Sequence, residues 1–272
     1  SPQNDSTIWV VTGRDFAYRC RTTVANGIPA ITSVDSIGFR NIFKARTQIY
    51  DIEIQDDSTI WFGSKGYGCL IYHSNTGKSE LLRFPKEYGV AINEITHISN
   101  FGDMVVSTRN SVAIHDPRKD STLIFKAPTY ISAKASMKDS NGNLWISTSS
   151  GIAVLDSNYN YIKSYGKLTG LPISEYSDRA YYRNKKTGTM FFGGTNGLTI
   201  IDDNVDVRPN SYLPEVYITK ITSNNKEHAL NQALDNGRLK LPYSNSAFSV
   251  RFSVIDHISQ QDYVFLYCLE GH

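Results

Sequence analysis

The chain has 272 residues, of which 40% are hydrophobic and 20% charged, a composition typical of a folded protein rather than a disordered one. The formal net charge is +2 and the sequence shows no basic cluster, so nothing in it favours binding to nucleic acid or to an anionic membrane. No apolar run approaches the roughly 20 residues that span a bilayer, and we expect no signal peptide at the start.

The cysteines and histidines indicate neither metal nor disulfide chemistry. Cys20, Cys69 and Cys268 lie in unrelated places without CxxC spacing, so we expect buried thiols rather than a zinc site or a disulfide framework. The six histidines are scattered without the spacing of metal ligands. We therefore predict no metal site and no bound cofactor.

A pattern of turn, strand, turn and strand recurs through residues 5–202. It is clearest at 140–156, where Asn141-Gly142 indicates a hairpin and Leu144-Trp145-Ile146 is an apolar run of strand length. Five copies are present, at residues 5–18, 57–72, 101–116, 140–156 and 186–202. Their anchor residues are Trp9, Trp61, Val105, Trp145 and Phe191, at intervals of 52, 44, 40 and 46 residues. This period is typical of four-stranded β-propeller blades, so we predict that the aromatic anchors pack between neighbouring blades.

Taken in order, the chain opens inside a blade, because residues 1–4 are too few and too polar for an inner strand. We expect strands within 16–25, a long connection at 28–37 and the next inner strand at 48–54. Later strands are expected at 81–84, at 94–98, at 131–138 and within 165–183.

The repeat stops after Asp202, and a different pattern follows. Alternating apolar residues indicate sandwich strands at 216–221 and 248–255, and a third strand is expected at 263–269. We therefore predict an all-β protein. About five propeller blades, part of a larger propeller, occupy residues 1–211, and a truncated immunoglobulin-like β-sandwich occupies 212–272.

These residues resemble a known family. The repeats are similar to the two-component-regulator propeller repeat, whose turn-Gly-x-Leu-Trp-x-Gly-Thr-x-x-Gly-Leu pattern is matched best by residues 140–156 and 186–202. The third copy departs from it at Val105 and Ser111. At the end of the chain, residues 267–271 (YCLEG) match the Tyr-x-Leu-Glu-Gly strand of the triple-tyrosine domain that follows these propellers.

The resemblance implies the periplasmic ectodomain of a two-component sensor histidine kinase, hybrid or classical. It also implies an oligosaccharide ligand, a homodimer formed through the C-terminal sandwich domain, and control of polysaccharide-utilisation genes. The kinase parts and the membrane helix are not in this sequence, so no catalytic residue is carried over and no nucleic-acid contact is expected in this segment. Because the family carries seven-bladed propellers, five copies imply a C-terminal fragment of a longer ectodomain.

In a propeller, the turns after the second strand of each blade share one face with the connections between blades. On that face we expect aromatic rings that stack on sugars and planar groups that bind hydroxyls and carboxylates. The first of these turns holds Arg14. The candidate ligand-binding residues are Lys65, Tyr67, Tyr88, Arg109, Tyr176, Arg179 and Asn196. Each could equally be a solvated loop residue, the default for polar loop tips.

Two other classes of function fit the same pattern. A glycan-cleaving enzyme needs carboxylates that face each other about 5–9 Å apart, and the inner strands offer Asp51, Glu53, Glu94 and Asp178. Acidic residues on inner strands are usually hydrogen-bonded within a propeller, which favours a binding role. A passive protein-binding scaffold also fits, because fold alone does not determine function. Whether five blades close into a ring or form an open arc stays undecided.

Overall fold

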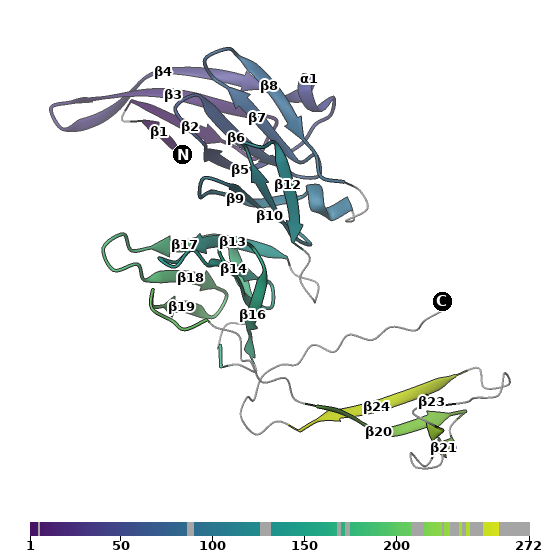
Figure 1. The fold of residues 1–272 in the computed structure, drawn as a ribbon. Helices are drawn as coiled ribbons and strands as arrows, with labels where there is room; N and C mark the ends of the chain where they lie inside the picture. The colour runs from purple at the N-terminus through teal and green to yellow at the C-terminus, as the bar shows by residue number, and fades with distance from the viewer. Residues whose placement is uncertain are drawn as a thin grey trace. The chain divides into compact units, whose positions relative to one another are not determined.

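The structure is a computed structural model of the chain. It describes residues 1–4, 6–85, 90–125, 132–167, 170–171, 175–207, 215–224, 226–228, 234–235, 238–239 and 247–255. These residues belong to two compact units, one within 1–208 and the other within 209–262. Both units are built from antiparallel β-sheets (Figure 1), which confirms the predicted all-β fold.

The first unit contains five successive sheets, each formed by strands that are consecutive in the chain. The first sheet consists of β1 (Pro2–Asn4), β2 (Thr7–Val11), β3 (Phe16–Ala25) and β4 (Ile28–Gly38). The second consists of β5 (Ile49–Ile54), β6 (Thr59–Ser64), β7 (Cys69–His73) and β8 (Lys78–Leu82). The third consists of β9 (Ile95–Asn100), β10 (Met104–Thr108), β11 (Val112–Asp116) and β12 (Ser121–Phe125). The fourth consists of β13 (Ala133–Lys138), β14 (Leu144–Thr148), β15 (Gly151–Leu155) and β16 (Tyr161–Tyr165). Within the described residues, the fifth consists of β17 (Tyr176–Arg183), β18 (Met190–Gly194) and β19 (Gly197–Ile201).

Local side-chain chemistry sets the first hairpin of each sheet. In all five, an Asn or Asp at or just after the end of the first strand accepts a hydrogen bond from the backbone N–H two residues later, which starts the turn. The five acceptors are Asn4, Asp56, Asn100, Asp139 and Asn184. The Asn or Asp before each anchor therefore recurs in the repeat because it forms the same turn in every sheet.

The three tryptophan anchors fill the spaces between sheets, as predicted for the aromatic anchors, and Val105 of the third sheet does the same. Trp9, Trp61, Val105 and Trp145 are at most 2% exposed. Each faces the sheet that follows it in the chain: the Trp9 ring, for example, lies 5.8 Å from the ring of Phe62 in β6, measured between centroids. Adjacent sheets therefore share one apolar layer, and the burial of these large rings holds them together.

Each anchor tryptophan also has a polar partner that the sequence analysis missed. In every case the indole N–H donates to a side-chain oxygen six residues earlier, at the end of the preceding strand or just after it. The pairs are Trp9 with Gln3 at 2.8 Å, Trp61 with Gln55 at 2.7 Å and Trp145 with Asp139 at 2.9 Å. A buried indole N–H needs an acceptor. A Gln or Asp six residues before a tryptophan is therefore a sequence feature that indicates a blade with a buried tryptophan.

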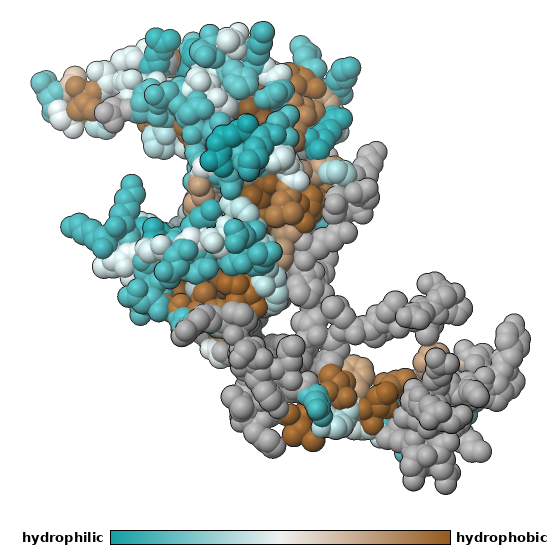
Figure 2. Space-filling model, in the orientation of Figure 1, coloured by the Kyte–Doolittle hydropathy of each residue, from teal (hydrophilic) through white to brown (hydrophobic). Residues whose placement is uncertain are grey.

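The fifth anchor differs from the others. Phe191 occupies the register position of Trp145 but is only partly buried, whereas its neighbour Phe192 is fully buried against the fourth sheet. Successive residues of a strand point to opposite faces, and no described sheet covers the face that Phe191 shares with Leu198 and Ile200. These last two are 53% and 61% exposed on β19, and Figure 2 shows apolar side chains gathered on this part of the surface. Packing of Phe191 between blades was thus a wrong prediction.

The first sheet corrects two further predictions. Residues 2–4 do form the first strand, paired with β2, because the backbone needs no apolar side chains to pair. Residues 28–37 are no connection but belong to β4, the second arm of a long hairpin whose turn is at Asn26-Gly27. The outer face of this sheet exposes Ile8 and Val10 at 38% and 40%. Among the described residues, apolar side chains are thus exposed on both the first and the fifth sheet.

The second unit contains a sheet of β21 (Lys226–His228), β20 (Val216–Ser223) and β24 (Phe248–Val254), and a short hairpin of β22 (Leu234–Asp235) and β23 (Arg238–Leu239). β20 and β24 confirm the two strands predicted there. Their side chains include several exposed apolar ones, such as Ile218 and its partner Phe252. The third predicted strand, at 263–269, lies outside the described residues.

Candidate functional site

The turns after the second strands are fixed to the entrances of their own sheets by a recurrent backbone hydrogen bond. In the second to fifth sheets, the first turn residue donates its N–H to the carbonyl of a residue just before the first strand. The donors are Lys65, Arg109, Ser149 and Thr195, and the acceptors are Gln48, Glu94, Ser132 and Glu175, at 2.9–3.2 Å. This geometry places turns and connections together, as the propeller pattern predicts.

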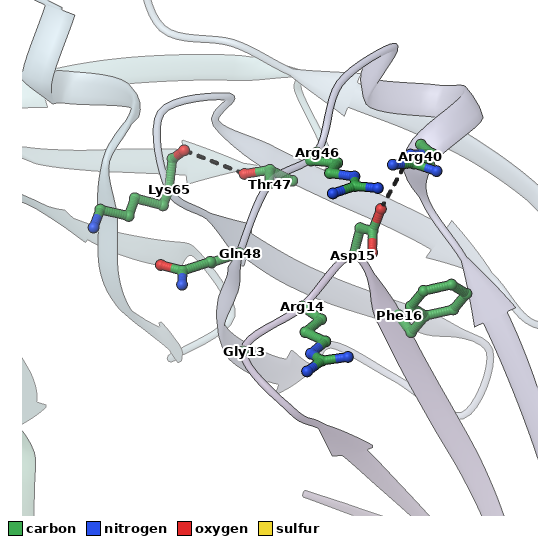
Figure 3. A pocket seen from close by; sticks show the side chains of 9 residues that line it. All are labelled: Gly13, Arg14, Asp15, Phe16, Arg40, Arg46, Thr47, Gln48 and Lys65. Carbon is green, nitrogen blue, oxygen red and sulfur yellow. Dashed lines mark hydrogen bonds and ion pairs between the residues drawn. The ribbon is translucent and has the colours of Figure 1, made fainter.

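A pocket of about 680 Å³ opens where the turn of the first sheet meets the connection to the second. Its lining comes from the β2–β3 turn, the connection that contains α1 (Arg40–Phe43), and the turn after β6. We call it the basic pocket, and it is lined by Gly13, Arg14, Asp15, Phe16, Arg40, Arg46, Thr47, Gln48 and Lys65 (Figure 3). Its volume is in the range of small-molecule sites.

Backbone contacts hold the walls of the basic pocket in place. Asp15 accepts a hydrogen bond from Phe39 N–H at 2.9 Å, and Arg14 accepts one from Ile49 N–H at 3.3 Å. Thr47, which is buried, donates its hydroxyl to the carbonyl of Lys65 at 3.2 Å. Three separate segments are thereby connected without using the charged side chains.

The short helix α1 is oriented by its apolar residues. Phe39 and Phe43 are 0% and 3% exposed and belong to the core between the first two sheets, where the Phe39 ring lies 4.8 Å from that of Phe62. This burial leaves Arg40 and Arg46 exposed at the pocket. The apolar residues of the connection therefore determine where its cations lie.

A second polar group lies among the inner strands, at the centre of the first unit. Asp51 on β5 accepts hydrogen bonds from the Nδ1 of His97 at 2.8 Å and from the backbone N–H of Ile98 at 2.7 Å. Because a carboxylate only accepts, the Nδ1 of His97 donates to Asp51, and the Nε2 of His97 is hydrogen-bonded to the hydroxyl of Ser99 at 2.8 Å. Ser99 also contacts the Ser136 hydroxyl at 3.0 Å, so the chain of contacts joins β5, β9 and β13.

The order of contacts from Asp51 to Ser99 is that of the catalytic triad of serine hydrolases. Asp51, His97 and Ser99 are, however, only 7%, 3% and 5% exposed. A nucleophile must be reached by its substrate, whereas these side chains satisfy one another inside the protein. Their geometry is that of a link between inner strands.

The other acidic candidates are distributed around this centre. Asp178 lies 3.0 Å from the Nζ of Lys134, and Glu94 accepts a hydrogen bond from Arg109 at 2.9 Å. Glu53 differs, because burial, and secondarily the charge of Asp51, raise its pKa from 4.5 to about 7. The same environment raises the pKa of Tyr181 to about 12.

Of the predicted ligand residues on the early blades, only Lys65 lines the basic pocket. The ring of Tyr67 packs on Phe43, 5.8 Å between centroids, and supports the core of the first two sheets. Arg109 is exposed and pairs with Glu94. These three residues therefore lie near the same turns but do not converge on one ligand.

Two predicted residues of the fifth sheet occupy other environments. Tyr176 is 1% exposed and its hydroxyl bonds that of Thr199 at 2.6 Å, so it is a core residue and not an exposed loop ring. It lies at the start of β17, where the fourth sheet covers it. Arg179 reaches across the inner strands, where its Nη1 donates to the carbonyl of Tyr50 at 2.6 Å.

Asn196 is exposed in the β18–β19 turn, and Tyr88 lies outside the described residues. Arg40 and Arg46 are not among the candidates predicted from the sequence, because those come from the turns and from the connections of later blades. Their signal was present: residues 39–46 (FRNIFKAR) combine three cations with three apolar residues that bury one side of the segment.

No metal or membrane signal appears in the described part of the chain. Among its residues, no three His, Cys, Asp or Glu side chains are grouped so that they could hold a metal ion. Cys20 and Cys69 are buried free thiols, as predicted, and Cys268 lies outside the described residues. The described helices include none with the length and apolar character needed to cross a bilayer.

Comparisons with known proteins find a curated relative and similar solved structures. No family model matches the chain. It is 24% identical over 325 residues to "Histidine kinase P4" of Formosa agariphila, an alignment that covers 94% of this chain and 23% of that protein. Its structure is similar to the extracellular domain of the hybrid two-component system BT3049 of B. thetaiotaomicron, with a TM-score of 0.61, 20% identity, and coverage of 93% of this chain and 34% of that one.

A second solved structure, the extracellular domain of the one-component system BT4673 of B. thetaiotaomicron, has a TM-score of 0.58, 14% identity and the same coverage. The chain thus spans about a quarter of the curated relative and about a third of these structures. These likenesses confirm the resemblance that the repeats predicted. The chain shares its all-β, propeller-like fold with the extracellular domains of two-component systems and is similar in sequence to a histidine kinase.

Proposed function

We propose that this chain is part of the ligand-sensing, periplasmic ectodomain of a two-component sensor histidine kinase, and that it binds an oligosaccharide in the basic pocket. The observation that carries the proposal is the convergence, on the turn-bearing face, of an exposed aromatic ring with polar side chains. The Phe16 ring is 41% exposed and offers a face on which a sugar can stack, while Gln48 and the cations supply hydrogen bonds. The similarity to sensors supports the same function.

Binding must also be coupled to the rest of the sensor. We expect a homodimer formed through the C-terminal unit, with the signal passing to a downstream membrane helix and then to polysaccharide-utilisation genes. A bound sugar shifts the dimer between two arrangements only if it binds them with different affinity.

Thermal unfolding of the purified chain against plant, host and microbial oligosaccharides tests the proposal. A ligand that binds only the folded state stabilises it by about 2.7 kcal/mol at one hundred times its Kd, which corresponds to a rise in melting temperature of roughly 5 °C or more. Phe16→Ala should reduce that rise. Leu123→Ala, which removes a side chain of similar exposure from β12, is the matched control and should leave it unchanged.

The alternatives predict different results in the same experiment. If mass spectrometry shows that a sugar is shortened during incubation, a glycan-cleaving enzyme replaces the sensor proposal. If no sugar class raises the melting temperature, oligosaccharide binding by this chain is contradicted. A rise that Phe16→Ala leaves intact contradicts the assignment to the basic pocket.

A further inference from the structure

We propose that the basic pocket recognises an anionic group, a sulfate or a carboxylate, carried by the oligosaccharide, so that the ligand is an acidic saccharide. This inference rests on the proposed function and narrows it to a class of ligand. It follows from the charge of the pocket, the hydrogen-bonding capacity of its side chains and the rigidity of its walls.

The charge of the pocket is unlike that of the whole chain. Its lining contains four basic side chains, Arg14, Arg40, Arg46 and Lys65, and a single carboxylate, Asp15. The surplus of three positive charges at this one site exceeds the net charge of +2 of all 272 residues. Cations brought together by the fold repel one another, and a bound anion relieves that repulsion.

The ion pairs within the pocket leave most of this charge uncompensated. Arg40 lies 3.7 Å from the Asp15 carboxylate, atom Nε to Oδ2, and these two form an ion pair. Arg14, Arg46 and Lys65 form no ion pair with any residue in the described ranges, and all three are exposed. Three cations are therefore available to a ligand.

Hydrogen-bonding capacity distinguishes an acidic sugar from a neutral one. Arginine and lysine are donors without an acceptor, so the ligand must supply acceptor atoms. A neutral sugar presents hydroxyls, each of which also donates and needs an acceptor. The pocket side chains offer few of these, because the Asp15 carboxylate is only 14% exposed and already paired, which leaves chiefly Gln48 and Thr47. Sulfate and carboxylate oxygens accept only, and arginine binds them in a charge-assisted, bidentate manner.

The position of the cations suits a group held between segments. In Figure 3, Arg40 and Arg46 lie on the side of the pocket where Asp15 is, while the Gln48 side chain points the other way, toward Lys65. The backbone contacts of Arg14, Thr47 and Lys65 connect these segments. An anion that enters thus meets donors whose backbone is already fixed, which lowers the entropy lost on binding.

Isothermal titration calorimetry with matched acidic and neutral saccharides tests the inference. The probes are sucrose octasulfate against sucrose, and a galacturonate tetramer against its methyl ester. We expect at least one acidic probe to bind ten or more times as tightly as its neutral partner, and its affinity to fall as salt rises from about 20 to about 300 mM. Arg46→Gln and Lys65→Gln should each weaken it by about tenfold at low salt, while Arg46→Lys, which keeps the charge but loses the bidentate geometry, should weaken it less than Arg46→Gln does.

The control is Lys119→Gln, which removes an exposed cation that pairs with Asp116 in the β11–β12 turn and should not change binding. If a neutral saccharide binds as tightly as its acidic partner and the charge variants have no effect, the anionic inference is overturned while oligosaccharide sensing stands. Inorganic sulfate is also tested as a competitor of sucrose octasulfate. If its affinity equals that of the octasulfate per sulfate group, the pocket binds the ion alone and the proposed saccharide class is wrong. If neither acidic probe binds, the inference fails even where another sugar raises the melting temperature.

Discussion

The hairpin sequence DSNxN occurs twice in the fourth sheet, and the two copies make a matched test of what stabilises a blade. In the first, Asp139 accepts hydrogen bonds from the backbone N–H groups of Asn141 and Asn143, from the Asn143 side chain and from the Trp145 indole, at 2.8–2.9 Å. In the second, Asp156 accepts the equivalent bonds from Asn158 and Asn160 at 2.8–2.9 Å but has no tryptophan. The copies differ in burial.

Asp139 is 6% exposed, and three of its donors are buried: the backbone and side-chain nitrogens of Asn143 and the indole nitrogen of Trp145. Asp139→Ala leaves these donors without an acceptor and without water. Each buried unsatisfied donor costs on the order of 1 kcal/mol or more, so we expect a loss of about 3 to 4 kcal/mol in the free energy of unfolding. The bonds of Asp156 are at the surface, where water replaces the carboxylate, and Asp156→Ala should cost only about 1 kcal/mol.

Urea unfolding followed by tryptophan fluorescence measures both variants. With a slope of about 2 to 3 kcal/mol per molar urea, Asp139→Ala should lower the midpoint by about 1 to 2 M, and Asp156→Ala by less than about 0.5 M. Equal midpoint shifts for the two variants would refute the reasoning, because they would mean that burial and the indole bond contribute nothing beyond the turn itself.

Two further predictions concern other features of the propeller-like unit. Because the pKa of Glu53 is raised from 4.5 to about 7, the folded state binds the proton more tightly than the unfolded chain, and stability falls as pH rises from about 4.5 to 7. Glu53→Gln should therefore raise the unfolding free energy by up to about 3 kcal/mol at pH 8 and leave it nearly unchanged at pH 4. Equal gains at both pH values would contradict the raised pKa of Glu53. Gly151 and Gly197 both have φ of +140°. An added Cβ would lie 2.0 Å from the carbonyl oxygen of Tyr165 at Gly151, whereas at Gly197 it would have no atom of the described residues within 4 Å. In thermal melts, Gly151→Ala should lower the free energy of unfolding by roughly 3 kcal/mol or more, and Gly197→Ala by about 1 kcal/mol. Similar losses for both variants would rule out contact with the Tyr165 carbonyl as the cause.

Much of the fold could be predicted from local features. Alternation of apolar residues identifies strands such as β14 and β24, because side chains of a strand face opposite sides. The turns were readable for a related reason: an Asn or Asp bonds a backbone N–H two residues away and needs no distant partner. The packing of Trp145 between blades could be predicted because a large side chain in the middle of a repeated strand is best buried against the neighbouring blade.

Predictions failed where the outcome depends on a neighbouring sheet. Phe191 has the register of Trp145, but whether such a ring is buried depends on the next sheet and not on its own strand. Tyr176 looks like a loop aromatic in sequence, and only the packing of the fourth sheet against β17 makes it a core residue. Arg179 donates a hydrogen bond to the carbonyl of Tyr50, a residue of another blade that no local pattern connects to it.

The sequence by itself determined the repeat, its strands and the face on which turns and connections meet. It showed a nearly neutral chain in which basic residues are not clustered in the sequence. In the folded structure, however, four basic side chains line one pocket. Arg14, Arg40, Arg46 and Lys65 lie in separate segments, and they come together because the buried Phe39 and Phe43 set the path of the connection. Charge acts through space, so only the tertiary structure could decide that the protein has a basic pocket.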